Sequence, residues 1–461
     1  MRRVIASIRE SLSGSHRDYT TGNIGRLIVL LAIPMVLEML MESLFGIVDI
    51  YFVARLGPDS VATVMLTESN LVLVFGIALG LSMATTAVVA RRIGEKDPEG
   101  AALASVQAII IGLVISIIVG AIGIVFAPRL LGLMGASPEV IATGHRYTAV
   151  LLGGSLVIFL IFLINAIFRG AGDPALAMRT LWLANAINIV LDPCLINGWG
   201  PFPRLGVMGA AVATTTGRAI GVAYQVHALM SGKSRVRIHL EQIKLNVDVM
   251  RKLIQVSFTG MIQFLISTAS WLALIRIVSQ FGTAAVAGYG LGIRIFLFVI
   301  LPSWGLSNAA ATLVGQNLGA GHPERSEKAV YQTGFYNMCY MVGISVLFVA
   351  FAPQLAGFFT DDPTVLPVAV MLLRILSLGN ICYAWGMVFV QAFNGAGDTG
   401  TPSKINFFCY WMFQIPLAWF LATAVGMGPK GVFSSIPTAE AAMTATSFVV
   451  FRRGAWKRKM I

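Results

Sequence analysis

Long apolar stretches alternate with short polar connections along the whole chain. A helix needs about 20 apolar residues to cross the hydrocarbon core of a bilayer. Hydrophobic residues make up 57% of the chain and charged residues only 12%, against about 25% charged in ordinary soluble domains. We therefore expect an all-α polytopic membrane protein, with loops too short to hold a soluble catalytic domain. The pattern predicts twelve transmembrane helices, at residues 27–55, 60–90, 101–127, 140–168, 178–197, 206–230, 253–279, 285–314, 326–352, 364–392, 403–425 and 431–451.

The chain contains an internal repeat. Its clearest sign is the run Phe168-Arg169-Gly170-Ala171-Gly172-Asp173, which returns 225 positions later as Phe393-Asn394-Gly395-Ala396-Gly397-Asp398. Duplicated halves are common in secondary transporters, so the repeat predicts two pseudo-symmetric lobes of six helices. The predicted organisation is a cytoplasmic N-terminal segment (1–25), an N-lobe (26–230), a cytoplasmic linker (231–252), a C-lobe (253–451) and a basic cytoplasmic tail (452–461).

The two copies differ in their acidic residues. The shift of 225 positions places Leu274 opposite Asp49 and Leu417 opposite Asp192. The prediction is that only the first copy keeps its buried acids, and that the chemistry lies in the N-lobe.

Basic residues fall unevenly on the two sides of the predicted bundle. With the N-terminus in the cytoplasm, 24 of the 33 Lys and Arg residues lie on the cytoplasmic side and four on the outer side. This asymmetry follows the positive-inside rule for a chain with both termini in the cytoplasm. Residues 1–25 lack the apolar core of a cleavable signal, so we expect the N-terminus to be retained. The predicted location is the cell (inner or plasma) membrane. The net charge of +12 is expected to orient the chain there and to contact lipid headgroups, not nucleic acid.

Motifs of enzymes and cofactor sites are missing or lack their structural context. The four cysteines have no CxxC spacing and the five histidines no HExxH spacing, so we expect no metal site of these types. Residues 395–400 fit GxGxxG, but an apolar helix precedes them where a dinucleotide site needs a strand. We expect this run to be a helix-ending turn. The prediction is a protein that is not an enzyme and holds no cofactor.

Three acids follow one stripe of the first predicted helix. Glu38, Glu42 and Asp49 lie within about 40° of each other on a helical projection. Because a charged group at bilayer depth costs on the order of 2.5–3.5 kcal/mol, this stripe is expected to face an aqueous cavity or the lobe interior. Pro34 lies one turn before Glu38 and predicts a point where the helix can bend.

Further polar groups of the first half can join these acids. Asn188 and Asp192 are four residues apart and share a helix face. Asn165 and Glu68 add an amide and a carboxylate on two other predicted helices. Carboxylates in one poorly hydrated pocket cannot both ionise cheaply, which suits a proton relay. The same oxygens could ligate Na⁺ at Asp49, Asn188 and Asp192, or the groups could be buried structural hydrogen bonds.

The second half places arginines rather than acids within its spans. Arg276, Arg294 and Arg374 fall toward the outer halves of their predicted helices. One interpretation is that they reach the outer headgroups or pair with carbonyls. The alternative is that they face Asp49, Glu68 or Asp192 across a cavity, or hold an anionic part of a substrate.

The chain resembles the multidrug and toxic compound extrusion (MATE) transporters, with most similarity to their DinF-like branch. The resemblance rests on Pro34 with Asp49, on Asn165, on the run Asn188-Ile189-Val190-Leu191-Asp192-Pro193 and on the paired Gly-Ala-Gly-Asp turns. It implies a monomeric, cation-coupled antiporter that expels amphipathic, often cationic, small molecules through a V-shaped cavity with alternating access. It also implies an N-lobe cation site at Asp49, Asn165, Asn188 and Asp192, and bending at Pro34 linked to protonation.

One departure from a family pattern affects the second half. The NorM-like branch places a coupling acid pair on its seventh and tenth helices, where this chain has Gln255, Gln263, Arg276 and Arg374. Coupling through the C-lobe is therefore not expected. The choice between H⁺ and Na⁺ stays open, with the shared carboxylates favouring H⁺.

Three other classes of protein are alternatives for a chain with this pattern. A lipid-linked oligosaccharide or lipid flippase of the same superfamily would use the three arginines on a pyrophosphate headgroup. A polytopic membrane enzyme would need a catalytic constellation, such as GxSxG, that the chain does not contain. A channel would need the ring symmetry of a selectivity filter, which two lobes do not provide.

Overall fold

The computed structural model describes residues 2–14, 17–238, 244–459 and 461, which are all-helical apart from their connections. Ten helices among them are long and apolar enough to cross a membrane. The N-terminal bundle consists of α2 (Ile24–Ala54), α3 (Pro58–Gly94), α4 (Pro98–Leu133), α5 with α6 (Pro138–Gly153 and Ser155–Ala171), α7 (Pro174–Asn197) and α8 (Val207–Met230). The C-terminal bundle consists of α9 (Val247–Val278), α10 (Thr283–Gly319), α11 (Pro323–Gly357), α12 (Leu366–Gly395), the composite helix from α13 (Gly400–Asn406) to η4 (Phe420–Ala424), and α15 (Pro429–Arg452).

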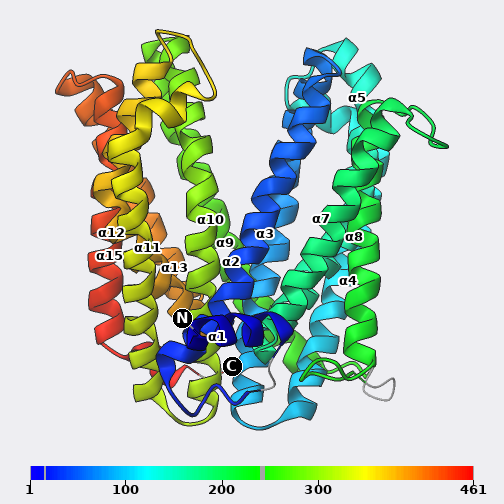
Figure 1. Cartoon of the computed structure of the whole chain (residues 1–461), viewed down its shortest axis with the longest axis vertical. Coiled ribbons are helices and arrows are strands. Elements are labelled where there is room, and N and C mark those ends of the chain that lie inside the picture. Colours follow the sequence, from blue (N-terminus) through cyan, green and yellow to red (C-terminus); the bar gives the residue numbers. More distant parts are fainter. Residues whose placement is uncertain (1, 15–16, 239–243, 460) are drawn as a thin grey trace.

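The predicted fold class is confirmed, and all twelve predicted helices are present. α8 and α15 fall outside the ten most apolar helices, but each packs as the last helix of its bundle. Figure 1 shows the two bundles as the arms of a V, which diverge at the end opposite both termini. Several helices continue past their predicted ends; α4, for example, ends at Leu133 rather than at residue 127.

The composite eleventh helix is the main irregularity that the sequence pattern did not predict. Between α13 and η4, the segment η3 (Phe407–Gln414) is π-helical, α14 (Ile415–Trp419) is α-helical, and η4 is again π-helical. A π-helix has hydrogen bonds between residues five apart instead of four, and such segments are rare and occur frequently at functional sites.

The twin Gly-Ala-Gly-Asp turns have the same geometry in both halves. Gly172 and Gly397 have φ angles of 86° and 80°, a left-handed conformation that favours glycine. The N–H of Asp173 donates to the Phe168 carbonyl at 2.8 Å, and the N–H of Asp398 donates to the Phe393 carbonyl at 2.9 Å. These are helix-ending turns, as predicted, and not dinucleotide-binding loops.

Glycines allow the two bundles to touch near the termini. A Cβ atom on Gly80 would lie 2.6 Å from the backbone nitrogen of Met261, and one on Gly305 would lie 2.6 Å from the Met35 carbonyl oxygen. Gly80 and Gly305 are repeat equivalents, so each bundle uses the same position to approach the other. Small residues serve this purpose in membranes because close backbone packing drives helix association there.

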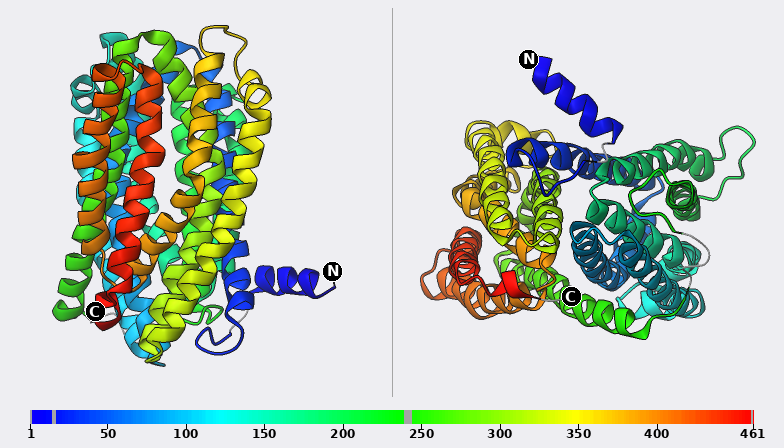
Figure 2. Two further views of the ribbon diagram at one scale, coloured as in Figure 1. Left: turned by 90° about the vertical axis from the view of Figure 1, so that its left-hand side faces the viewer. Right: turned by 90° about the horizontal axis from the view of Figure 1, so that it is seen from below.

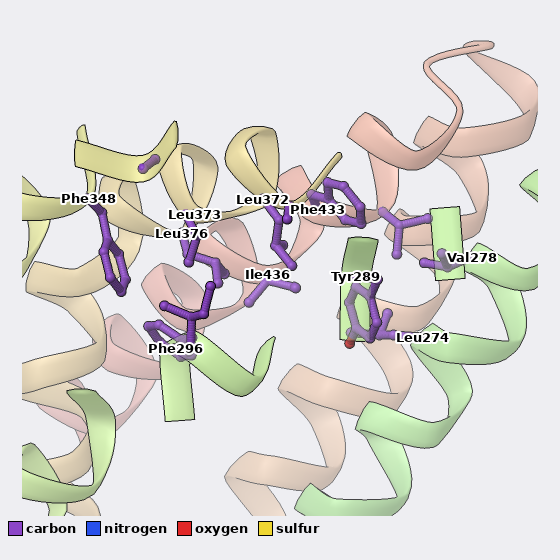
Figure 3. Close-up of a cluster of buried hydrophobic side chains, with 14 of the residues drawn as sticks. Leu274, Val278, Tyr289, Phe296, Phe348, Leu372, Leu373, Leu376, Phe433 and Ile436 are labelled. Atoms are coloured by element: carbon purple, nitrogen blue, oxygen red, sulfur yellow. The ribbon is translucent and has the colours of Figure 1, made fainter. Parts of the chain in front are cut away.

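The far end of the C-terminal bundle has its own apolar core. Figure 3 shows Phe296, Phe348, Leu372 and Phe433 of four different helices converging there, with Tyr289 stacked on Phe433 at 5.9 Å between ring centroids. This core holds the arm together where it no longer contacts the other bundle.

A short amphipathic helix, α1 (Arg2–Ser13), precedes the first span and lies across the long axis of the bundle (Figure 2). It is fixed by Arg179 Nη2, which donates to the Leu12 carbonyl at 2.6 Å, and by an ion pair of 2.7 Å between Glu10 and Arg26. This helix falls within the predicted N-terminal segment, of which residues 1, 15 and 16 are outside the described residues.

The predicted linker 231–252 is described except for residues 239–243. Its first part is held to the N-terminal bundle by Asp173, whose Oδ2 accepts from the backbone N–H of Arg235 at 2.7 Å. Its last part is held by Gln107, whose Nε2 donates to the Lys244 carbonyl at 2.8 Å. The predicted linker also overlaps the first residues of α9, which begins at Val247.

Candidate functional site

Asp192 and Asn188 form a buried polar pair on α7. Asn188 Nδ2 lies 3.3 Å from Asp192 Oδ1 and 3.0 Å from the hydroxyl of Thr214 on α8. The shared helix face predicted from their spacing is therefore confirmed. Gly217 brings α8 close to α7, since a Cβ atom there would lie 2.5 Å from the Ala184 carbonyl oxygen. Asp192 is fully buried, so its charge depends on this small set of neighbours.

Asp49 of α2 faces the same region. Its carboxylate lies within electrostatic range of Asp192, Glu68 and Arg218. The buried ring of Tyr147 on α5 is close enough to feel the charges of Asp49 and Asp192. The structure therefore brings Asp49 and Asp192 into one cluster, although they are 143 positions apart in the sequence.

Three acceptor oxygens in this cluster lack a hydrogen-bond donor among the described residues. They are Asp49 Oδ1, Asn188 Oδ1 and Asp192 Oδ2. A buried acceptor without a donor costs about 1–3 kcal/mol, so these three oxygens can accept from water, from a proton or from a bound cation. The described part of the chain holds no group of three or more His, Cys, Asp or Glu side chains suited to a metal ion.

Asn165 belongs to a different cluster from Asp49. Its Nδ2 donates to Glu38 Oε1 at 3.3 Å, and its Oδ1 accepts from Gln225 Nε2 at 2.7 Å. Glu38 is 1% exposed and forms an ion pair of 2.8 Å with Arg169 of α6. The resemblance joined Asn165 to Asp49, Asn188 and Asp192, whereas here its side-chain hydrogen bonds run to Glu38 and Gln225.

Glu42 lies between the two clusters. It accepts from Asn185 Nδ2 at 3.2 Å and lies 3.8 Å from Arg218 Nη2. Glu38, Glu42 and Asp49 thus meet partners on α6, α7 and α8, which confirms that the acidic stripe faces the bundle interior. The positive charges that offset it, Arg169 and Arg218, come from the same lobe.

Arg169 was not predicted as a partner of this stripe. The sequence places it beside a cytoplasmic turn, where it was counted among the charges on the inner side. Its side chain is only 13% exposed and turns inward to Glu38, a contact that the count of inner-side charges did not predict. The repeat carried a signal, because Arg169 is the one position of the Phe-x-Gly-Ala-Gly-Asp run that differs between copies.

Pro34 lies inside α2 and is buried. Because proline has no N–H, the Leu30 carbonyl one turn earlier cannot make its helical hydrogen bond. The hydroxyl of Ser11 on α1 donates to that carbonyl at 2.8 Å.

The three arginines of the C-terminal bundle differ in their surroundings. Arg294 lies within electrostatic range of Glu68 on the opposite bundle, as one of the two interpretations proposed. Arg276 and Arg374 are exposed. Within the described ranges, no ion pair involves either of them.

The second copy also has a buried acid, which contradicts the prediction that only the first copy keeps one. Glu440 of α15 is 2% exposed, and its Oε1 accepts from the Tyr410 hydroxyl at 3.0 Å. The repeat comparison missed it because its counterpart is Thr215, a neutral residue. The signal was present, since Glu440 is the only acid inside the predicted helix 431–451.

Comparison with known proteins identifies the family. The MatE family model matches residues 34–194 and 260–420, one match in each half of the chain. The chain belongs to the MatE family. It is therefore a multi-pass membrane transporter and not an enzyme.

Known MatE relatives match nearly the whole chain. A probable multidrug resistance protein NorM from Thermotoga maritima is 24% identical, over 94% of this chain and 93% of its own length. An FAD transporter from Shewanella oneidensis is 25% identical, over 93% of this chain and 95% of its own length. The structure of a multidrug resistance MATE transporter in an outward-facing conformation superposes with a TM-score of 0.90 at 26% identity, over 96% of this chain and 98% of the other.

Proposed function

We propose that this MatE transporter is a cation-coupled antiporter that exports amphipathic, often cationic, small molecules, with its coupling site at Asp49, Asn188 and Asp192. The observation that carries the proposal is the group of three buried oxygens without donors in that cluster. A proton or Na⁺ would satisfy them when bound and leave them unsatisfied when released. Bound and free states would then differ in free energy, which is what coupling requires.

H⁺ is the favoured coupling ion. Asp49 and Asp192 lie within electrostatic range of each other, and like charges in one poorly hydrated place oppose ionisation of both. A single proton would relieve this repulsion by neutralising one carboxyl group. Na⁺ binding at the same oxygens is the alternative, because hard cations prefer oxygen ligands.

Alternating access is supported by the arrangement of the two bundles. They touch through Gly80 and Gly305 near the termini and diverge at the other end (Figure 1). With the termini in the cytoplasm, as the distribution of basic residues favours, this is an outward-open state. Glu68 and Arg294 lie within electrostatic range of each other on opposite bundles, so a substrate that enters between the bundles would meet both signs of charge.

Two finer assignments go with this function. The NorM-like acid pair is missing: α12 carries no acid, and α9 carries only Asp248 in its exposed first turn. This absence supports the DinF-like branch. We also propose a monomer in the cell membrane, in contact with lipids, because each bundle already packs against the other within one chain.

The proposal is tested by uptake of a fluorescent amphipathic cation into inverted membrane vesicles, with the H⁺ and Na⁺ gradients collapsed in turn. Uptake should disappear with one gradient and with Asp49→Asn. It should persist in Asp361→Asn, which removes an exposed acid from an outer loop. Uptake by Asp49→Asn at the wild-type level would refute the N-lobe site. Uptake under neither gradient would favour the lipid flippase instead.

A further inference from the structure

A second polar site lies in the C-terminal bundle, on the side that faces the N-terminal bundle. A cavity of about 230 Å³ is lined there by residues of α9, α10, α12, α13, η3 and α15, and by Met83 of α3 in the other bundle. Its wall combines aromatic and amide side chains, among them Gln263, Trp271, Trp304, Asn394, Asn406 and Tyr410. The size and the mixed wall suit part of a small organic molecule better than a bare ion.

The amide groups of this wall present oxygens rather than N–H groups. Gln263 Oε1, Asn394 Oδ1 and Asn406 Oδ1 are buried and have no donor within the described residues. The nitrogens of the two asparagines are already engaged, with Gln391 Oε1 at 3.2 Å and Ser267 Oγ at 3.0 Å. A ligand that donates hydrogen bonds and carries positive charge would satisfy these oxygens.

The acid that can balance such a charge lies directly behind the wall. Glu440 contacts Tyr410, which lines the cavity, and Met443 on the next turn of α15 lines it as well. Glu440 Oε1 accepts from the Tyr410 hydroxyl, while Oε2 is buried without a donor among the described residues. Only one of the two carboxyl oxygens of Glu440 therefore accepts a hydrogen bond within the described residues.

The groups around Glu440 supply no positive charge. The titratable side chains within its electrostatic range are Tyr410 and Cys409 of η3 and Cys382 and Tyr383 of α12. The elements packed on α15 carry further charged groups. None of them forms an ion pair with Glu440 in the described ranges: Asp248, Arg251, Lys252, Arg276, Arg374, Lys404, Lys457 and Arg458. An unpaired acid at bilayer depth is costly and marks a functional site by default.

The π-helical segment η3 is a second, independent sign of function. It places Tyr410 between Glu440 and the cavity, and the N–H of Ile415 reaches back five residues to the Tyr410 carbonyl. π-helical segments are rare and occur frequently at functional sites. Here η3 positions Tyr410, which separates Glu440 from the cavity.

We propose that Glu440 is a proton-exchange site of the C-lobe, which releases its proton when an amine-bearing or quaternary organic cation occupies the cavity of Gln263, Asn394, Asn406 and Tyr410. In this exchange the O–H bond of the Glu440 carboxyl group breaks and the proton leaves to water in the cavity. The incoming cation restores the charge balance, and the Tyr410 hydroxyl donates to the new carboxylate. The proposal rests on the proposed export function, because it names a substrate class for the same transporter.

The site differs from the expected family pattern in a specific way. The acid lies on the twelfth membrane helix, whereas the positions on the seventh and tenth helices are neutral in this chain. The neighbouring pocket of about 60 Å³ shares Met83, Trp304, Gln391 and Asn394 with the cavity and reaches Arg169, the partner of Glu38. The two adjacent pockets thus lie between Arg169, the partner of Glu38, and Tyr410, the partner of Glu440.

The first test is infrared titration of the purified full-length protein in liposomes. Wild-type protein should lose a protonated-carboxyl band as the pH is raised, and this band should be absent from Glu440→Gln. It should persist in Glu324→Gln, a control that removes an exposed acid on α11, and in Asp49→Asn, which removes the N-lobe acid. If Glu440→Gln showed the same protonated-carboxyl bands as the wild type, the proposal would be overturned. This readout does not depend on transport, so it separates failure here from failure of the proposed function.

The second test measures proton release when tetraphenylphosphonium is added to the same proteins in weakly buffered solution. Wild-type protein should release a proton that Glu440→Gln does not release at equal probe occupancy. Tyr410→Phe, which keeps the ring but removes the hydroxyl, should bind the probe more weakly and shift the pH at which release occurs. Equal release from wild type and Glu440→Gln, or no release from either, would show that the Glu440–Tyr410 contact is only structural.

Discussion

The hydroxyl of Ser11 donates a hydrogen bond to the carbonyl oxygen of Leu30 at 2.8 Å, and this carbonyl is the one that Pro34 leaves without a helical partner. The N-terminal helix α1 is thus joined to the one point where α2 is free to bend. A bend at Pro34 that moves the Leu30 carbonyl would break this contact. The position of α1 and the conformation of α2 are coupled through a single hydrogen bond.

Replacing Ser11 should make the Pro34 region easier to deform. We expect Ser11→Ala to cost about 1 kcal/mol of stability, since a buried carbonyl loses its only donor. Thermal unfolding in detergent measures the cost, and the distance between spin labels placed on both sides of Pro34 measures the bending. Ser13→Ala, which removes an exposed hydroxyl on the same helix, should change neither. Equal behaviour of Ser11→Ala and Ser13→Ala would show that the contact does not restrain the helix.

A side chain at Gly80 should force the two bundles apart near the termini. The new Cβ atom would meet the backbone of Met261, which cannot move aside, and overpacking of this kind costs about 1–3 kcal/mol. Gly80→Ala should therefore depopulate the state in Figure 1 and lower the melting temperature. Gly46→Ala on α2 is the matched control, because no atom lies within 4 Å of the added carbon. An unchanged melting temperature for Gly80→Ala would count against the tight approach of α3 and α9.

The ion pair between Glu38 and Arg169 should be costly to break from one side. Arg169→Gln leaves Glu38 buried without its cation, which we expect to cost about 3–5 kcal/mol. Adding Glu38→Gln to Arg169→Gln should recover much of the loss. The partly exposed pair Arg92–Glu95, at 2.6 Å, should contribute at most about 1 kcal/mol.

A double-mutant cycle of thermal stability separates these effects. Additive losses for the two substitutions at Glu38 and Arg169 would show that the pair is not coupled.

Arg294 should affect substrate choice rather than folding. It is exposed and lies within electrostatic range of Glu68 on the opposite bundle. Arg294→Gln should reduce transport of anionic or zwitterionic substrates and leave cationic substrates largely unaffected. Competition assays with substrates of each charge measure this, with Lys430→Gln as an exposed basic control in the first turn of α15. A substrate profile identical to that of the wild type would exclude this role.

The fold could be predicted from the sequence because membrane helices leave a direct signal. Long apolar runs mark the spans, and the constant shift between the two copies gives the repeat. The π-helical segment η3 left no such signal, because its residues are as apolar as those of an ordinary span. The helix α1 was missed because its 12 residues are too polar to mark a span.

The candidate site was predicted in part. Helical spacing was enough to pair Asn188 with Asp192 and to align Glu38 with Glu42, because both relations lie within one helix. Contacts between helices depend on packing that spacing does not encode. Arg169 and Gln225, which bind Glu38 and Asn165, were therefore missed, and Glu440 was overlooked because its repeat equivalent is neutral.

The most direct test of the account is ion movement driven by a substrate gradient in proteoliposomes. A gradient of a permeable fluorescent cation should drive H⁺ in the opposite direction through the wild-type protein. Asp49→Asn and Asp192→Asn should each abolish this H⁺ flux while binding of the probe persists, since the account makes these two N-lobe acids necessary for coupling and places the substrate cavity in the C-terminal bundle. H⁺ flux that continues at the wild-type rate in both variants would contradict the N-lobe coupling site.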